Sequence, residues 1–360
     1  MAAAKSDLQG NIVQPSLTGT VDRFRALPKI ELHRHLEGSL RLQTMLEIAR
    51  AHNIAIPADM AGLSSLVQMQ ESESYSFRNF LSKFDTLRLF YRSPEVIDRI
   101  TREAIEDAAR DNIRYLELRF TPVALSRAEG FPLNEVMDWV AASARAAAAE
   151  FDMHVRLVAS VNRHESPALA EQVARLAAER MDDGLVGMDL AGNEAEFSAE
   201  PFRGIFLEAQ QSGLRLSIHA GEWGPAANVR EAIEYLGAHR IAHGVRVLED
   251  DSVVALARER RIPFEVCVTS NYQSGVVPHA GQHPLPGMLA AGLVVTVNTD
   301  DPSVSRITLS HEYQVVVDEL GVPLEGLRDC VLAAAQAAHL PEDERQMLVR
   351  TLQQEIPAHF

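Results

Sequence analysis

Eight short runs of β-type residues alternate with helical segments along the 360-residue chain, and this rhythm limits the folds that it can adopt. Alanine-, leucine- and glutamate-rich stretches at helical spacing, such as residues 133–150 and 167–181, separate the runs. The runs lie at residues 28–39, 114–121, 154–162, 185–193, 215–222, 240–247, 264–271 and 294–301. Eight βα units in one chain predict an α/β fold of the TIM (β/α)8 barrel type.

The alternative fold is a doubly wound sheet, but such a sheet rarely has eight regular units, and the sequence shows no glycine-rich phosphate loop. No repeat or linker divides the chain, so we expect a single domain over residues 1–360, with residues 1–20 as a flexible arm. The connection at residues 38–113 is far longer than a βα loop requires. We therefore expect a helical insertion that covers the barrel mouth, with a peripheral helical decoration as the alternative.

The charge of the chain excludes some classes of partner. It carries 34 basic and 50 acidic residues, a net charge of −16, which argues against non-specific binding to nucleic acid or anionic membranes. No apolar run reaches the roughly 18 residues of a membrane span, and the N-terminal residues do not resemble a secretory signal. The only cysteines, Cys267 and Cys330, are expected to be reduced. We expect a cytoplasmic protein.

Polar residues follow several of the expected strands. His33 and His35 lie two apart and therefore project from one face of the first strand. His219 ends the fifth strand and Asp300 the eighth. Because all strands of a barrel end at the same mouth, we expect these four side chains to meet there. Imidazole nitrogens and a carboxylate are ligands that Zn²⁺ prefers, so the pattern predicts a metal site.

Three further residues at the same mouth suit hydrolysis, since a bound divalent ion lowers the pKa of its water towards neutrality. Glu222 is placed to be a general acid if an apolar pocket keeps it protonated. His243 is a candidate base or electrostatic clamp, and Asp301 a candidate to orient water or substrate. The alternatives are that Glu222 caps the helix near Pro225, that Asp301 caps the turn at Pro302, and that the histidine is an ordinary core residue.

Six motifs together resemble the adenosine deaminase family of metal-dependent barrel hydrolases. They occur in order between Leu27 and Ser303, as LPKIELHRHLEG, DLAGNE, SIHAGE, RIAHG, CVTSN and VNTDDP. The resemblance implies that one zinc ion is bound by His33, His35, His219 and Asp300. It also implies that Glu222 protonates the ring nitrogen beside the amino-bearing carbon and that His243 accepts a proton from the attacking water. Asp301 would then contact the water and the purine, and the backbone of Gly192 the purine.

One observation limits the number of metal ions. Related barrels with two metals commonly bridge them through a carboxylated lysine on the fourth strand. The fourth expected strand here, residues 185–193, has no lysine, and none occurs after Lys83. We therefore expect one Zn²⁺ per chain.

The substrate side is ambiguous. The nucleoside-specific branch of the family often has Asp where Glu37 stands, and Glu resembles the adenine- and aminofutalosine-acting branches as well. CVTSNYQSG at residues 267–275 looks closer to bacterial adenosine deaminases. His35 and Glu37 are expected to contact the substrate, and Arg34 to point away from the metal. The expected function is zinc-dependent hydrolytic deamination of a 6-aminopurine nucleoside. The alternatives are a deaminase of free adenine or aminofutalosine, and a non-catalytic nucleoside-binding barrel; the oligomeric state stays open.

Overall fold

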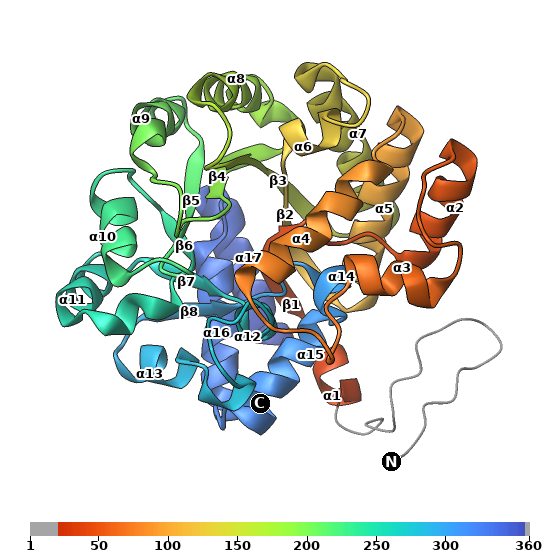
Figure 1. Cartoon of the computed structure of the whole chain (residues 1–360). Helices are drawn as coiled ribbons and strands as arrows, with labels where there is room; N and C mark the ends of the chain where they lie inside the picture. The colour runs from red at the N-terminus through yellow and green to blue at the C-terminus, as the bar shows by residue number, and fades with distance from the viewer. Residues whose placement is uncertain (1–20, 357–360) are drawn as a thin grey trace, which may run out of the picture.

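Eight parallel strands form one sheet in chain order in the computed structural model, which describes residues 21–356. The strands are β1 (Lys29–His35), β2 (Ile113–Phe120), β3 (His154–Asn162), β4 (Leu185–Ala191), β5 (Arg215–Ala220), β6 (Arg240–His243), β7 (Pro263–Val266) and β8 (Val294–Val297). Figure 1 shows the strands at the centre of a ring of helices. The predicted (β/α)8 barrel is confirmed.

The helices cover the outside of the barrel because each buries one apolar stripe. In the long helix α5, for example, Ile97, Ile100 and Ala104 are buried. The helices are α1 (Val21–Arg25), α2 (Leu42–His52), α3 (Met60–Val67), α4 (Phe77–Leu87), α5 (Pro94–Arg110), α6 (Pro122–Ser126), α7 (Leu133–Glu150), α8 (Pro167–Ala178), α9 (Arg203–Gln211), α10 (Ala226–Glu234), α11 (Asp251–Glu259), α12 (Val268–Gln273), α13 (Leu285–Ala290), α14 (Pro302–Ser305), α15 (Leu309–Gln314), α16 (Leu324–Ala337) and α17 (Glu342–Glu355). Within residues 21–356, none of them is long and apolar enough to cross a membrane.

The barrel closes between β1 and the residues that follow β8. The backbone N–H of His35 donates to the carbonyl of Asp300, and the N–H of Asp300 donates to the carbonyl of His33, both at 2.9 Å. The side chain of Asn298 accepts from the N–H of Leu32, also at 2.9 Å. The segment that completes the barrel is therefore the one that carries the expected metal ligands.

Several strands end earlier than their sequence predicts. The expected strand at 264–271 is wrong in its second half, because β7 ends at Val266 and residues 268–273 form α12. The expected strands at 240–247 and 294–301 end at His243 and Val297. His243, the last residue of β6, and Asp300, which follows β8, have φ angles of 58° and 65°, a left-handed conformation that ends an extended strand. Their backbones turn the polar side chains into the barrel mouth.

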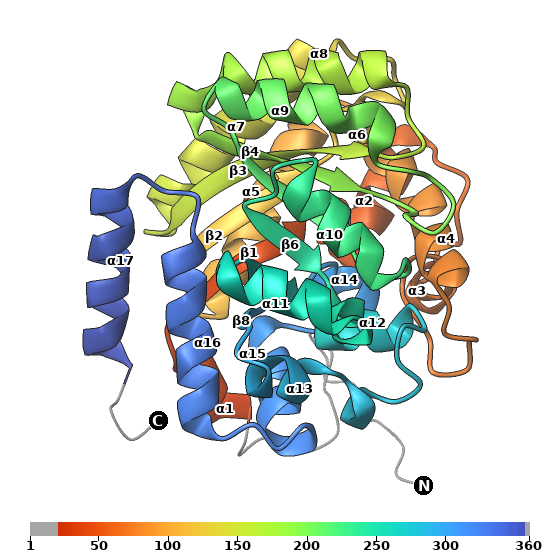
Figure 2. The same cartoon turned by 90° about the vertical axis from the view of Figure 1, so that its left-hand side faces the viewer.

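The long segment between β1 and β2 contains α2, α3 and α4 before α5, which packs against the barrel. Figure 2 shows α3 and α4 at one end of the barrel, with α17 on the opposite side of the molecule. Phe80, Leu81 and Phe84 of α4 line the same pocket as His35 and the other residues at the strand ends.

Candidate active site

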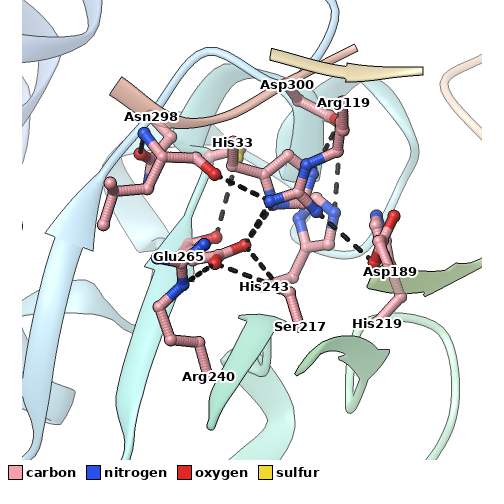
Figure 3. A network of polar contacts seen from close by, with 12 residues as sticks. His33, Arg119, Asp189, Ser217, His219, Arg240, His243, Glu265, Asn298 and Asp300 are labelled. Carbon is pink, nitrogen blue, oxygen red and sulfur yellow. Dashed lines mark hydrogen bonds and ion pairs between the residues drawn. The ribbon is translucent and has the colours of Figure 1, made fainter. Parts of the chain in front are cut away.

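The four residues expected to bind metal meet at the carboxyl ends of the strands (Figure 3 labels three of them). Nε2 of His33 lies 3.1 Å from Oδ1 of Asp300, and Nε2 of His35 lies 3.4 Å from the same oxygen. The His219 ring centroid lies 4.8 Å from that of His33 and 5.5 Å from that of His35. Strand alternation places the two β1 histidines together, and barrel closure brings Asp300 to them.

Two overlapping groups of these side chains have ligand atoms within 4.8 Å of one another. One group contains His33, His219 and Asp300 with His243, and the other contains His35 and His219 with Asp189. Both groups are suited to a metal ion by atom type, and His219 belongs to both. His243, expected to act on water, therefore lies as close to the first group as the expected ligands do.

Two buried carboxylates determine which ring nitrogens face the centre. Nδ1 of His33 lies 2.9 Å from Oε2 of Glu265, and Nδ1 of His219 lies 2.8 Å from Oδ1 of Asp189. Since the Nδ1 atoms are occupied, the Nε2 atoms are left for a metal. We missed both carboxylates in the sequence, although Asp189 belongs to the DLAGNE motif. Glu265 lies inside β7, where its sequence looks like that of an ordinary core strand.

The carboxylates are themselves held by buried arginines, as Figure 3 shows. Nη2 of Arg119 lies 2.8 Å from Glu265, and Nη1 lies 3.4 Å from Asp189. Arg240 binds Glu265 from the other side, at 2.5 Å. Although burial opposes ionisation, Arg119 and Arg240 hold the pKa of Glu265 well below its usual range. The two histidines thus face ionised partners that fix their ring orientation.

Glu222 lies on the turn after β5 and is buried beside His243, whose Nε2 is 3.6 Å from Oε2 of Glu222. Burial, followed by the charges of Asp300 and Glu194, raises the pKa of Glu222 well above its usual value. The raised pKa favours the protonated form, which a general acid requires. The alternative cap role is wrong, because α10 has Pro225 at its N-cap and no side-chain cap bond.

Asp301, Glu37 and Gly192 line the same pocket. Oδ1 of Asp301 and Oε2 of Glu37 are buried without a hydrogen-bond partner among residues 21–356, while Oε1 of Glu37 accepts from the backbone N–H of Thr121 at 2.7 Å. Asp301 makes no cap bond at the start of α14, so that alternative role is also wrong. These oxygens are free to accept hydrogen bonds from a ligand.

The remaining walls of the pocket combine apolar and polar surface, as small-molecule sites do. Phe80, Leu81 and Phe84 of α4 and Trp223 supply apolar side chains, and Arg88 supplies a cation. Arg34, between the two β1 histidines, points elsewhere: its Nη1 donates to the carbonyl of Ala104 in α5 at 3.3 Å. The expectation from strand alternation is confirmed for this residue.

The donor set fits a divalent ion. Three imidazoles and a carboxylate converge on one buried point. The remaining ring nitrogens of His33 and His219 are hydrogen-bonded to carboxylates, which is how proteins orient metal-binding histidines. A (β/α)8 barrel with such a cluster at the strand ends, and beside it a buried carboxyl group with a raised pKa, has the features of the class of metal-dependent hydrolases.

Comparison with known proteins narrows this class. The family described as adenosine deaminase matches residues 28–355. An adenosine deaminase of Klebsiella pneumoniae subsp. pneumoniae is 36% identical over 327 residues, which cover 90% of this chain and 97% of that protein. The chain belongs to the adenosine deaminase family. It is accordingly a hydrolase that acts on a C–N bond of a cyclic amidine.

Three solved structures have similar folds. An adenine deaminase from Arthrobacter aurescens has a TM-score of 0.84 at 26% identity and covers 91% of this chain and 98% of its own. The Arabidopsis protein ADAL in complex with IMP has a TM-score of 0.83 at 29% identity, with 94% and 100% coverage. An amidohydrolase from Burkholderia ambifaria with bound zinc has a TM-score of 0.83 at 26% identity, with 96% and 97% coverage.

Proposed function

We propose that this protein catalyses the zinc-dependent hydrolytic deamination of a 6-aminopurine nucleoside such as adenosine, releasing ammonia. The observation that carries the proposal is the position of Glu222, which is buried, has a raised pKa and lies 3.6 Å from a histidine of the metal cluster within one pocket. The zinc identity rests on the nitrogen-rich donor set and on the zinc in a similar solved structure.

The residues of the chain divide the reaction between them. Zinc bound by His33, His35, His219 and Asp300 would supply a water whose pKa is near neutrality. Glu222 donates its proton to the ring nitrogen beside the amino-bearing carbon, which makes that carbon more electrophilic. His243 and Asp301 act on the water from the metal side of the pocket. The N–H of Gly192 holds the purine. The amino group gains a proton, which balances the one that the water loses, and leaves as ammonia, while the proton of the added hydroxyl group returns to Glu222 as the carbonyl forms.

Glu37, in the wall of the pocket, indicates which group is attached to the purine of the substrate. The unpartnered Oε2 of Glu37 suits a sugar hydroxyl, which is a hydrogen-bond donor. A free base would leave this buried oxygen unpaired, at a cost of about 1–3 kcal/mol. This difference favours a nucleoside over free adenine. Aminofutalosine, which also carries a sugar, remains an alternative substrate.

One observation favours a second candidate, a nucleoside monophosphate. Arg88 lines the pocket beside Glu37, and its guanidinium makes no hydrogen bond or ion pair with any residue in 21–356. An unpaired arginine is a suitable partner for a phosphate. The IMP-bound relative shows that a barrel of similar fold admits a nucleotide.

The assay that tests the proposal compares ammonia release from adenosine, adenine, AMP and aminofutalosine, with metal content measured on the same preparation. We expect kcat/KM to be highest on adenosine, with about one zinc per chain. A higher kcat/KM on adenine or AMP would mean that this compound, and not adenosine, is the preferred substrate. Metal-loaded protein that releases no ammonia from any of them would revive the non-catalytic nucleoside-binding barrel.

Three broader expectations belong to the same proposal. We propose that the enzyme is cytoplasmic, that residues 1–360 form one domain, and that residues 38–113 cover the barrel mouth. The last of these is supported by Phe80 and Phe84 of α4 in the wall of the pocket. The arm expected at residues 1–20 lies outside the described residues.

A further inference from the structure

The buried side-chain amide of Asn271 connects His243 and Glu222, two residues of the site, to His283, which lies outside it. Asn271, in α12, is fully buried. Its Nδ2 lies 3.1 Å from Nδ1 of His243 and 3.5 Å from Oε1 of Glu222. On its other side, its Oδ1 lies 3.1 Å from Nε2 of His283. The direction of these bonds decides where the protons of the site are.

The direction follows from a backbone N–H, which can only donate. The N–H of Leu285 lies 3.1 Å from Nδ1 of His283, so this ring nitrogen must be the acceptor. Burial lowers the pKa of His283 to about 3, so its ring is neutral and carries one proton. Since Nδ1 accepts, that proton is on Nε2, which faces Asn271.

The orientation of the Asn271 amide is then determined. The atom that faces the Nε2–H of His283 must be the carbonyl oxygen, so the NH₂ group faces His243 and Glu222. An amide nitrogen donates only. Nδ1 of His243 is therefore an acceptor, and a neutral His243 must carry its proton on Nε2. This is the nitrogen that faces Oε2 of Glu222 and Oδ2 of Asp300.

The same amide also acts on the general acid. Its second hydrogen points to Oε1 of Glu222, which accepts at 3.5 Å, and this contact favours the acidic proton on Oε2. Among the residues described, Asn271 is hydrogen-bonded through one nitrogen to both His243 and Glu222. One side chain thus sets the proton position of both.

We propose that His283 and Asn271 are positioning residues that hold His243 as the Nε2–H tautomer. His243 then stabilises the oxygen of the attacking water by donating a hydrogen bond, and keeps its own proton. The proton that the water releases passes to solvent, since bound zinc would lower the pKa of that water towards neutrality. The catalytic consequence rests on the proposed function, but the tautomer does not. With its proton on Nε2, His243 cannot be the base that the family resemblance implies.

The tautomer is tested by nitrogen NMR on the full-length, zinc-loaded protein with ¹⁵N-labelled histidine. The His243 signals are identified by their loss in His243→Gln. We expect the neutral Nε2–H pattern in the wild type. In Asn271→Asp, whose carboxylate only accepts, we expect the proton on Nδ1. An Nδ1–H pattern in the wild type, or no change in Asn271→Asp, overturns the proposal.

A matched pair of variants tests the contribution of His283. In His283→Gln the amide nitrogen takes the place of Nε2 and still donates to Asn271, whereas in His283→Asn it reaches only the place of Nδ1. We expect kcat to fall about 100-fold or more in His283→Asn, with KM within about threefold, and at most about tenfold in His283→Gln. Equal losses in both variants, or no loss in His283→Asn, contradict the proposed hydrogen-bond chain from His283 through Asn271 to His243.

The outcomes of the two proposals are distinguishable. The NMR measurement needs no turnover, so a protein without deaminase activity would overturn the proposed function while the His243 tautomer could still be read. If the wild type is active and His243 is the Nδ1–H tautomer, the proposed function is retained and the positioning role of His283 and Asn271 is refuted.

Discussion

The carboxylate of Glu194 accepts a 2.6 Å hydrogen bond from the backbone N–H of Glu222, the proposed general acid. It also accepts from the N–H groups of Gly221, Trp223 and Gly224 at 2.8 to 3.0 Å. A single buried side chain from the loop after β4 therefore holds the turn after β5. The position of the acid therefore depends on this turn as well as on the contact of its carboxyl group with Asn271.

The first prediction concerns this turn. Glu194→Ala leaves four N–H groups without their acceptor, three of them buried, and each buried one costs about 1–3 kcal/mol if no water replaces the carboxylate. We expect a lower Tm and a kcat reduced by about 10²-fold or more, because Glu222 moves. Glu196→Ala, an exposed change two residues along the same loop, is the control and should retain both. Similar kcat values for the two variants would refute the role of Glu194.

The second prediction is that Glu222→Gln loses activity by about 10²- to 10⁴-fold, since the amide has no acidic proton to donate. Turnover is measured as ammonia release under saturating substrate. KM should change little if the glutamine retains the shape of the site. Full activity in Glu222→Gln would remove the acid role from this residue.

The third prediction is the effect of the same variant on stability. Burial raises the pKa of Glu222 in the folded protein above its unfolded value of about 4.3. The proton-linked stability is therefore complete below that pH and is lost as the pH rises towards the folded-state pKa. Glutamine does not titrate. The Tm of Glu222→Gln relative to wild type should increase between pH 4.5 and 8, and a pH-independent difference would contradict the raised pKa.

The fourth prediction concerns Asp189, the carboxylate bonded to Nδ1 of the proposed metal ligand His219. In Asp189→Asn the acceptor for Nδ1 is weakened, and we expect zinc affinity to fall about 10- to 100-fold. Competition with a zinc chelator measures this affinity without turnover. Asp182→Asn, an exposed change just before β4, is the control and should bind zinc like the wild type. Unchanged affinity in Asp189→Asn would show that the hydrogen bond does not tune the metal.

The fifth prediction concerns Gly38, which follows Glu37 on the turn after β1. A Cβ at this position would overlap the carboxylate of Asp301. We expect Gly38→Ala to displace Asp301 and lower kcat/KM by at least about 10²-fold. Gly204→Ala, where the added Cβ meets nothing within 4 Å, is the control and should keep its activity. Equal activities would mean that Asp301 is not held by this contact.

The sequence by itself determined the barrel and the residue types at its mouth. Alternation of β-type and helical runs is a local property, and so is the two-residue spacing that puts His33 and His35 on one face. The motifs after the strands also place His219, Glu222 and Asp300 at one end of the fold, because parallel strands in a barrel share their polarity.

Only the tertiary structure decided which atoms meet. The bonds of Asp189 and Glu265 to the Nδ1 atoms of two histidines join different strands, and they depend on the register and closure of the barrel. Asn271 lies in a helix where its sequence predicts a strand, so its contact with His243 was not foreseeable. Sequence periodicity describes one helix or strand at a time. The position of a proton depends on distances between side chains of different elements, and those distances are set when the barrel packs.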